Sequence, residues 1–336
     1  MCCQGTWPRC MLYSGAYVRY DDGQVCAMTM DRTAPTVVVI GDVITDLVVR
    51  LRQPLVVASD TASTISTRPG GSGANQAAWL AYIAPQFNVH FVGCVGQDPF
   101  GAYHDAELRR SGVLPHLGVD PHRSTGTIIV LVDGDGERSM LTDRGANLGL
   151  RVEDLPTEVF QPGACLHLSG YTLADPRTRE VAHAAIGLAR DHAMTVSVDP
   201  ASASLLREVG PDRFLEWTRG ADLCFPNLDE GRLLSGETDP AAVARSLCAW
   251  YGGVALKLAA QGALWARGGE PTLSQTALPI TVVDSTGAGD AFCAGFLASW
   301  LGGRGAEDAL AAGVRLGSIA VAQVGARPPA PAPPAT

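Results

Sequence analysis

Short apolar runs rich in β-branched residues alternate with segments of helical hydrophobic spacing along most of the chain. The strand-like runs are 37–40, 89–95, 165–168, 195–199, 223–226 and 253–258. The helix-like segments between them include 74–84, 103–111, 178–192 and 240–250. A repeated strand-then-helix order is typical of a mostly parallel sheet with helices on both faces. The pattern therefore predicts a doubly wound α/β domain.

A second group of β-rich segments has no helices between its members. These segments are 45–51, 64–68, 127–132 and 139–142. The turn sequence Asp-Gly-Asp-Gly at 133–136 separates the last two and predicts a hairpin. We expect the four segments to form a small accessory sheet inserted into the α/β body.

The two ends of the chain lack these patterns. Residues 1–33 contain four of the nine cysteines and no apolar period, whereas residues 36–40 begin abruptly as a β-branched run. We expect one folded domain over 34–327, with 1–33 a disordered or dispensable extension, or the product of an over-extended gene model; an ordered functional arm is the alternative. The proline-rich segment that starts at Arg327 cannot join a core, so 328–336 is predicted to be a tail.

Composition removes several function classes. With 25 Lys+Arg against 34 Asp+Glu, the net charge of −9 argues against nucleic acid and acidic membranes as partners. No stretch of 18 apolar residues and no signal peptide is present, so we expect neither a membrane protein nor a secreted one. The nine cysteines form no C-x-x-C pair, and the histidines have no metal-binding spacing, which favours a reducing cytoplasm without a zinc site.

Lys257 is the only lysine of the chain, and it lies between two leucines. A Walker A loop requires Lys between Gly and Ser or Thr, so P-loop NTPases are excluded. The sequence also contains no H-R-D or D-F-G triplet, which argues against a protein kinase.

The most informative segment is 282–292, Val-Val-Asp-Ser-Thr-Gly-Ala-Gly-Asp-Ala-Phe. It predicts a strand that runs into a small-residue turn and then a helix. Gly287, Ala288 and Gly289 leave backbone N–H groups uncovered at the positive end of this helix, where phosphate or a developing oxyanion binds. Asp290 would repel phosphate there unless it acted as a general base on an attacking hydroxyl. The alternative is that Asp290 only caps the helix.

A second glycine-rich loop, residues 69–78, also leads into a helix. Gly70 and Gly71 allow a ligand to approach the backbone, and the Asn75 amide can donate to and accept from a polyhydroxylated ligand. The loop is not a dinucleotide-binding fingerprint, because Gln76 stands where Gly or Ala is required.

Together these two segments resemble the signature motifs of the ribokinase-like (PfkB) carbohydrate kinase family, which includes adenosine kinase and related nucleoside kinases. The resemblance spans about residues 36–327. Further family features follow in the right order: Gly41 with Asp46, the G-x-D-x-x-G turn at 96–101, the N-x-x-E motif of Asn227 and Glu230, and the segment 257–263.

The resemblance implies a fold, cofactors and residue roles. It implies a lid formed by the inserted sheet, ATP at one end of the cleft, and Asp290 as the catalytic base. Asp46 would hold substrate hydroxyls together with Gly70, Gly71 and Asn75, and Asn227 and Glu230 would organise Mg²⁺ through water. Lys257 and Gly262 would lie beside the nucleotide, and Asp284 would help to bind K⁺. The alternatives are an Asp284 carboxylate satisfied by the following turn and a Lys257 that extends from the core edge to solvent.

Some positions depart from ribokinase. Ser169-Gly170-Tyr171 stands where ribokinases have a glutamate, and Val314 where they have an asparagine near the nucleotide. The substrate therefore need not be ribose. Arg144 either binds a carboxylate or phosphate of an acidic sugar or is a solvated arginine at a strand end.

We therefore predict an ATP-dependent kinase that phosphorylates a hydroxymethyl group of a sugar or sugar-like molecule, and that forms a homodimer partly through its lids. A nucleoside kinase of the adenosine or pseudouridine type is the alternative. A non-catalytic sugar or nucleotide sensor is a more distant one, because such a protein is expected to have lost Asp290 or the N-x-x-E pair.

Overall fold

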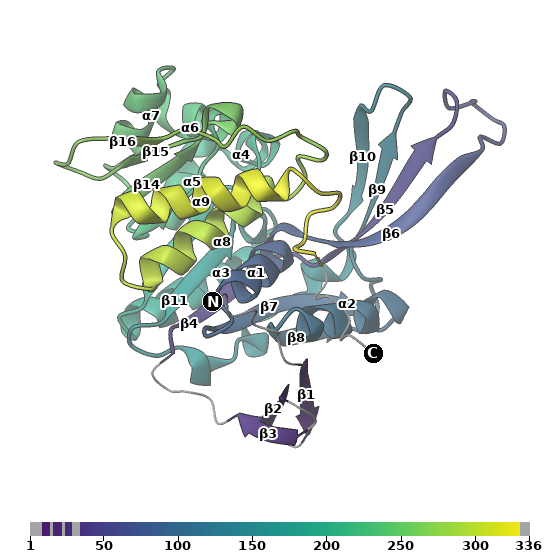
Figure 1. Cartoon of the computed structure of the whole chain (residues 1–336), viewed down its shortest axis with the longest axis horizontal. Coiled ribbons are helices and arrows are strands. Elements are labelled where there is room, and N and C mark those ends of the chain that lie inside the picture. The colour runs from purple at the N-terminus through teal and green to yellow at the C-terminus, as the bar shows by residue number, and fades with distance from the viewer. Residues whose placement is uncertain (1–8, 14–15, 22–23, 29–33, 330–336) are drawn as a thin grey trace, which may run out of the picture.

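The computed structural model describes residues 9–13, 16–21, 24–28 and 34–329. Its main sheet has nine strands in the order β16-β15-β14-β13-β12-β11-β4-β7-β8 (Figure 1). Their bounds are β4 Thr36–Ile40, β7 Asn88–Gly96, β8 Leu114–Asp120, β11 Cys165–Ser169, β12 Thr195–Asp199, β13 Leu223–Cys224, β14 Gly253–Lys257, β15 Ala263–Ala266 and β16 Leu273–Gln275. The strands from β14 to β8 pair in parallel, while β15 and β16 extend the sheet as antiparallel strands. The predicted doubly wound α/β fold is confirmed.

Helices cover both faces of this sheet. They are α1 Ser72–Ile83, α2 Pro99–Arg110, α3 Pro176–Asp191, α4 Ala203–Val209, α5 Pro211–Thr218, α6 Leu228–Ser235, α7 Pro240–Leu247, α8 Ala288–Leu301 and α9 Ala306–Ala320. Alternate residues of β4 show the two layers: Val37 and Val39 pack with α1, α8 and α9, whereas Val38 and Ile40 pack with α3 and α7. A strand buried on both faces needs apolar residues at every position, which explains the continuous run at 37–40.

Chain order reverses between two neighbouring strands, β4 and β11. From β4 the parallel strands proceed to β7 and β8 on one side, and from β11 they proceed to β12, β13 and β14 on the other. In doubly wound sheets, ligands bind outside the carboxyl ends of the strands at such a switch point. The fold therefore directs attention to the loops that follow β4, β11 and β12.

The inserted strands form a separate sheet, called the lid sheet below, in the order β10-β9-β5-β6. It consists of β5 Ile44–Leu51, β6 Ser63–Gly70, β9 Thr127–Val132 and β10 Arg138–Asp143. β9 and β10 form the predicted hairpin, and the Gly136 N–H donates to the Asp133 carbonyl at 3.2 Å in its turn. The sheet projects from the body beside β7 and α2 (Figure 1).

Two details differ from the sequence-based expectation. Residues 282–283 are not a strand: the Val283 N–H donates instead to the Val321 carbonyl at the end of α9, at 2.7 Å, and both valine side chains are exposed. The second difference is at the edge of the main sheet, where β15 and β16 follow β14. The apolar pattern did not predict these two strands.

The N-terminal stretch forms a small antiparallel sheet of its own, with β1 Arg9–Tyr13, β2 Ala16–Asp21 and β3 Gln24–Met28. In the part of the chain that the structure describes, no strand of the main sheet or the lid sheet pairs with it. The rest of 1–33 and residues 330–336 of the predicted tail lie outside the described residues. Among the helices described, none has the length and apolarity that a membrane crossing requires.

A chain that begins at Met30 is expected to fold and to retain activity like the full chain, because the strands at 9–28 hydrogen-bond only with one another among the described strands. Thermal unfolding and turnover of both chains test this. A large fall in the melting temperature or in kcat on truncation would contradict the prediction and support an ordered functional arm.

Candidate active site

The predicted residues of the two glycine-rich loops lie together near the switch point of the main sheet. The loop after β4 lies against the start of α1, since a Cβ atom at Gly41 would lie 2.7 Å from the Gly73 Cα. Asp290, in the first turn of α8, reaches the same turn of α1 across 218 residues of sequence. The two glycine-rich loops, 69–73 and 284–289, therefore meet at one place.

Asp290 is held by two donors from α1. The Ser72 hydroxyl donates to Asp290 Oδ1 at 2.8 Å, and the Asn75 amide donates to Oδ2 at 3.0 Å. The residue is only 9 % exposed, and the N-terminus of α8 has no side-chain capping bond. The carboxylate thus points across to α1, which argues against the alternative that Asp290 merely caps its own helix.

The surroundings of Asp290 place its titration near neutral pH. Burial raises its pKa to about 7, against the lowering effect of the Asn75 hydrogen bond. Asp199 raises the pKa further, while Ser72 and Lys257 lower it. A general base works best when its pKa lies near the operating pH, and the raised pKa of Asp290 meets that condition.

The loop before α8 is fixed from behind by the C-terminal segment. Gly287 is the N-cap of α8 with φ +77°, and a Cβ atom there would lie 2.6 Å from the Ala326 Cα. Glycine is required at this position both for the left-handed backbone and for the close approach. The Ala288 N–H lies 3.3 Å from the Ser285 carbonyl. The Gly289 amide follows it at the positive end of the helix.

Asp284 is surrounded by donors. Its carboxylate accepts from the Thr286 N–H at 2.8 Å and the Gly325 N–H at 3.1 Å, and it pairs with Arg138 of β10 at 2.9 Å. Arg138 also donates to the Thr286 hydroxyl at 2.8 Å. A potassium ion needs oxygen ligands, so this arrangement, with a guanidinium against the carboxylate, does not fit one. The alternative prediction, in which the turn after Asp284 satisfies its carboxylate, agrees with the observed contacts. Arg138 of the lid sheet is an additional partner that the sequence did not indicate.

On the acceptor side, Asp46 projects from β5 of the lid sheet toward Gly70. A Cβ atom at Gly70 would collide with the Asp46 carboxylate, and Gly71 has φ +89° at the N-cap of α1. Burial raises the pKa of Asp46 to about 6, against the lowering effect of Arg327. Asp46, Gly70, Gly71 and Asn75 are thus brought together as predicted.

Arg327, the last residue of the predicted domain, belongs to this group, although the sequence analysis gave it no role. It is 9 % exposed, its Nε donates to Asn75 Oδ1, and its Nη2 donates to the Gly70 carbonyl, both at 3.2 Å. The predicted domain, 34–327, includes Arg327, but the proline-rich composition that follows it gave no reason to expect this side chain at the site. The only sequence signal was a single cation within an otherwise apolar C-terminal stretch.

Asn227 and Glu230 form a capping box at the start of α6. The Glu230 N–H donates to Asn227 Oδ1 at 2.9 Å, while both carboxylate oxygens of Glu230 accept from Asn227 nitrogens, at 2.8 and 2.6 Å. Burial raises the pKa of Glu230 to about 7, and Lys257 lowers it. Because Glu230 is 1 % exposed while Asn227 is exposed, the pair fits a metal ion only through bridging water and not by direct coordination.

Lys257, at the end of β14, lies below the loop that precedes α8. Its Nζ is 3.2 Å from Asp199 Oδ1, and a Cβ atom at Gly289 would lie 3.4 Å from Nζ. Burial alone would lower the pKa of Lys257, but Asp199, Cys293 and Glu230 outweigh it and raise the pKa. The alternative that this lysine extends to solvent is therefore wrong. Gly262 lies at the end of the β14–β15 turn with φ +94°, apart from the Asp290 cluster.

Arg144 is paired with a carboxylate and is not solvated. Its Nε and Nη2 both donate to the Asp42 carboxylate at 2.8 Å. Asn147, three residues later, bonds to the Val43 N–H and carbonyl, each at 2.9 Å. This segment therefore fixes the loop after β4. The hypothesis of a solvated Arg144 was wrong, and binding of an acidic sugar by this arginine stays a prediction.

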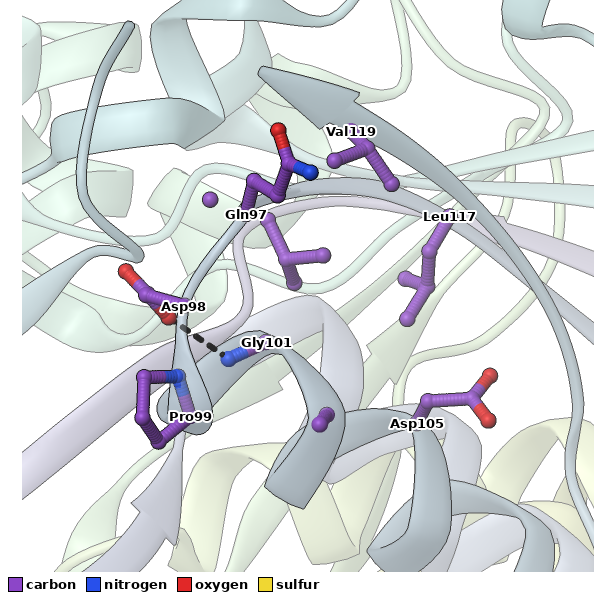
Figure 2. A pocket seen from close by; sticks show the side chains of 10 residues that line it. Gln97, Asp98, Pro99, Gly101, Asp105, Leu117 and Val119 are labelled. Atoms are coloured by element: carbon purple, nitrogen blue, oxygen red, sulfur yellow. Dashed lines mark hydrogen bonds between the residues drawn. The ribbon is translucent and has the colours of Figure 1, made fainter. Parts of the chain in front are cut away.

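A separate pocket of about 560 Å³ lies between β7, α2 and β8 (Figure 2). Asp98 caps α2 at its edge by accepting from the Gly101 N–H at 2.8 Å. None of the predicted site residues lines this pocket. The G-x-D-x-x-G turn therefore has a structural task here: its aspartate ties α2 to Thr125, whose N–H donates to Asp98 at 2.7 Å.

Lys257→Met is expected to reduce the free energy of unfolding by about 3–5 kcal/mol, because it leaves the buried Asp199 carboxylate unpaired. Denaturant unfolding measures the loss. The double variant Lys257→Met/Asp199→Asn removes both charges and should recover much of it. Equal instability of the single and double variants would show that the ion pair is not the cause.

Comparison with known proteins agrees with this geometry. Residues 34–333 match the pfkB family carbohydrate kinase family. The chain is 30 % identical over 271 residues to a fructokinase of Vibrio alginolyticus, covering 77 % of this chain and 82 % of that protein. It is 27 % identical over 309 residues to a ribokinase of Schizosaccharomyces pombe, covering 86 % and 93 %.

Solved structures show the same fold. An adenosine kinase from Sinorhizobium meliloti superposes with a TM-score of 0.78 at 26 % identity, covering 88 % of this chain and 96 % of that one. A fructokinase from Vibrio cholerae O395, solved with fructose, ADP and calcium, gives 0.73 at 27 % identity, covering 87 % and 94 %. With its sheet, its lid and its two glycine-rich loops, the chain belongs to the pfkB family of carbohydrate kinases.

Proposed function

We propose that this kinase transfers the γ-phosphoryl group of ATP to a hydroxymethyl oxygen of a sugar or sugar-like molecule, with Asp290 as the general base. The observation that carries the proposal is the buried Asp290 carboxylate at the N-terminus of α8, held by Ser72 and Asn75 and with its pKa raised to about 7. Such a carboxylate accepts a proton near neutral pH.

In this mechanism Asp290 removes the proton of the acceptor hydroxyl as its oxygen attacks the γ-phosphorus. The bond from that phosphorus to the β-bridging oxygen breaks, and ADP leaves with the electron pair. The amides of Gly287, Gly289 and Asp290 stabilise the charge on the transferring phosphoryl group. The Ala288 N–H, which the sequence predicted to be uncovered, already donates to the Ser285 carbonyl at 3.3 Å. Lys257, beneath Gly289, adds positive field behind these amides.

The acceptor is held from the lid and from α1. Asp46 accepts hydrogen bonds from substrate hydroxyls, and the backbone of Gly70 and Gly71 allows the substrate to approach closely. Asn75 contributes the part of its amide that does not bond to Asp290. Asp46 stands on the face of the lid sheet that is turned toward Gly70. Movement of the lid sheet would therefore move a substrate-binding carboxylate and exclude water at the same time.

The nucleotide is assigned to the other side of the loop before α8, beside Lys257 and Gly262. Asn227 and Glu230 would hold Mg²⁺ through water, and the ion would neutralise phosphate charge when bound. The role of the capping box is to keep the Asn227 side chain fixed at the exposed end of α6. The K⁺ ion predicted at Asp284 does not fit the donors that surround that carboxylate, so it forms no part of this proposal.

A nucleoside kinase is retained as a second candidate, because an adenosine kinase is among the solved structures most similar to this chain. A panel of sugars and nucleosides, assayed for acceptor-dependent ADP release, separates the two candidate functions.

A cytoplasmic location also remains a prediction. The described cysteines, Cys94, Cys165, Cys224, Cys248 and Cys293, are free thiols.

Asp290→Asn is expected to reduce kcat by at least about 10²-fold with little change in melting temperature or ATP affinity, because an amide cannot take the acceptor proton. In the wild type, kcat should fall as the pH drops through about 7, where the Asp290 carboxylate becomes protonated. The pH profile of kcat with the best acceptor measures both effects.

Asp46→Ala serves as the comparison variant and should mainly raise the KM of the acceptor, because Asp46 binds hydroxyls in the ground state as well as in the transition state. Turnover of Asp290→Asn close to wild type would show that the assignment of the base is incorrect.

We also propose that two copies associate through the lid sheet. Strand register places Leu141 opposite Ile129 and Ile65 opposite Val49, on the face opposite to Asp46 and Met140. On this outer face Leu141 is 57 % exposed and Ile65 63 %. An exposed apolar face on a sheet with open edges is typical of an interface.

The dimer predicts that Leu141→Lys shifts the protein toward monomer at micromolar concentration, as measured by sedimentation velocity. Met140→Lys is the matched control: Met140 is 55 % exposed on the neighbouring position of β10 but on the opposite face, so it should leave the mass unchanged. A wild-type protein that is monomeric throughout this concentration range would contradict the proposal.

A further inference from the structure

The C-terminal segment enters the active site between α1 and the loop before α8. The Trp79 indole N–H, from α1, donates to the Ala326 carbonyl at 2.9 Å. On the other side, the Ala326 backbone lies against Gly287, where a Cβ atom would not fit. The backbone just before Arg327 is thus fixed on two sides, and the arginine side chain starts from a defined point.

The Arg327 guanidinium then contacts the acceptor side of the site through two of its three nitrogens. Nε donates to Asn75 Oδ1 and Nη2 to the Gly70 carbonyl, each at 3.2 Å. Nη1 is buried without a hydrogen-bond partner among the described residues. Buried polar atoms normally have a partner, so this nitrogen marks a place where a ligand oxygen or a water is needed.

The contact with Asn75 has a consequence for Asp290. A guanidinium only donates hydrogen bonds, so the Asn75 oxygen must face Arg327, and its NH₂ group then faces the Asp290 carboxylate at 3.0 Å. Were the amide reversed, its oxygen would oppose the ionised carboxylate. Arg327 thus favours the same orientation of Asn75 that the ionised Asp290 needs, and it maintains that orientation when Asp290 is protonated.

We propose that Arg327 is a positioning residue for the phosphoryl-transfer base: it orients Asn75 so that the amide donates to Asp290, and it adds a positive charge that keeps Asp290 ionised. The inference rests on the proposed function of Asp290. It assigns a chemical task to a residue outside both glycine-rich loops.

The charged groups around Asp290 and Arg327 determine in which direction the pKa of Asp290 changes when Arg327 is replaced. Asp290 is faced by Asp199 of β12, Lys257 of β14, Cys293 of its own helix and Tyr171 of the segment after β11. Arg327 is faced by Glu107, Tyr103 and His104 of α2, by Asp46 of β5 and by Asp290. Burial lowers the pKa of Arg327 to about 10, so it is charged at neutral pH. Loss of this charge and of the Asn75 orientation must therefore raise the pKa of Asp290.

The test is a carboxyl ¹³C NMR titration of the full chain without substrate, in which the aspartate resonance that disappears in Asp290→Asn is followed in each variant. In Arg327→Met we expect its pKa to rise by about one unit. Arg179→Met is the matched control: Arg179 donates to the Leu173 and Ala174 carbonyls and lies over the Trp217 ring, so it should leave this pKa unchanged. An unchanged Asp290 pKa in Arg327→Met overturns the inference.

Kinetics give a second readout. In Arg327→Met we expect kcat at pH 7 to fall about fivefold, because a rise of the Asp290 pKa by about one unit from about 7 lowers the ionised fraction from about one half to about one tenth. The loss should shrink as the pH is raised above the new pKa. A parallel loss at every pH indicates a structural role only and overturns the inference. Arg327→Lys, which keeps the charge and a donor, should restore most of the pH profile. Arg327→Gln, which removes the charge but keeps a polar side chain, replaces the methionine variant in both measurements if that variant does not fold.

The two readouts separate the two proposals. A raised Asp290 pKa in a protein whose Asp290→Asn variant retains full turnover would refute the base assignment while the Arg327 contact stands. The other outcome concerns Arg327 alone. If wild-type turnover depends on pH, Asp290→Asn abolishes that turnover, and Arg327→Met leaves the pH profile unshifted, then only the role of Arg327 is refuted.

Discussion

A carboxylate buried between two helix N-termini is the constraint on which the rest of the site depends. Asp290 is 9 % exposed, and an ionised group at that depth is stable only with donors at close range. Ser72 and Asn75 supply them, so α1 must begin against the first turn of α8. The glycines of the two loops allow other segments to pack against them: a Cβ atom at Gly71 would collide with the Asp42 carbonyl, and one at Gly287 would collide with the Ala326 backbone.

Below this carboxylate, a buried polar network balances the remaining charge. Asp199 accepts from Lys257 at 3.2 Å and from Gln76 at 2.9 Å, and the Gln76 oxygen meets His167 Nε2 at 3.1 Å. Burial lowers the pKa of His167 to about 4, so the imidazole is neutral at physiological pH. The single lysine of the chain is thus used in the interior, next to two carboxylates, where one misplaced charge would be costly.

Local patterns predicted those parts of the structure that depend on local geometry. The alternation of strands and helices, the lid hairpin and the two glycine-rich loops could be read from the sequence because backbone conformation and helix N-termini impose their own residue choices. Contacts between distant segments could not be predicted in this way. Arg327 and Asn75 are 252 residues apart, and Arg138 and Thr286 are 148 residues apart. No period or motif links such pairs, because a long flexible side chain can satisfy a distant partner from many backbone positions.

The lid sheet is connected to both halves of the proposed reaction through opposite ends of its strands. Asp46, near the start of β5, faces the acceptor side, while Arg138, at the start of β10, pairs with Asp284 and donates to Thr286 in the loop that precedes α8. The lid therefore cannot change its position without altering a contact of that loop. Because the Gly325 N–H also donates to Asp284, and Arg327 follows two residues later, the same loop joins the lid to the C-terminal segment that orients Asn75. The proposed acceptor-binding carboxylate, the loop before α8 and the proposed base are therefore all linked to the position of the lid sheet, although Asp46 lies more than 200 residues before Asp284 and Asp290.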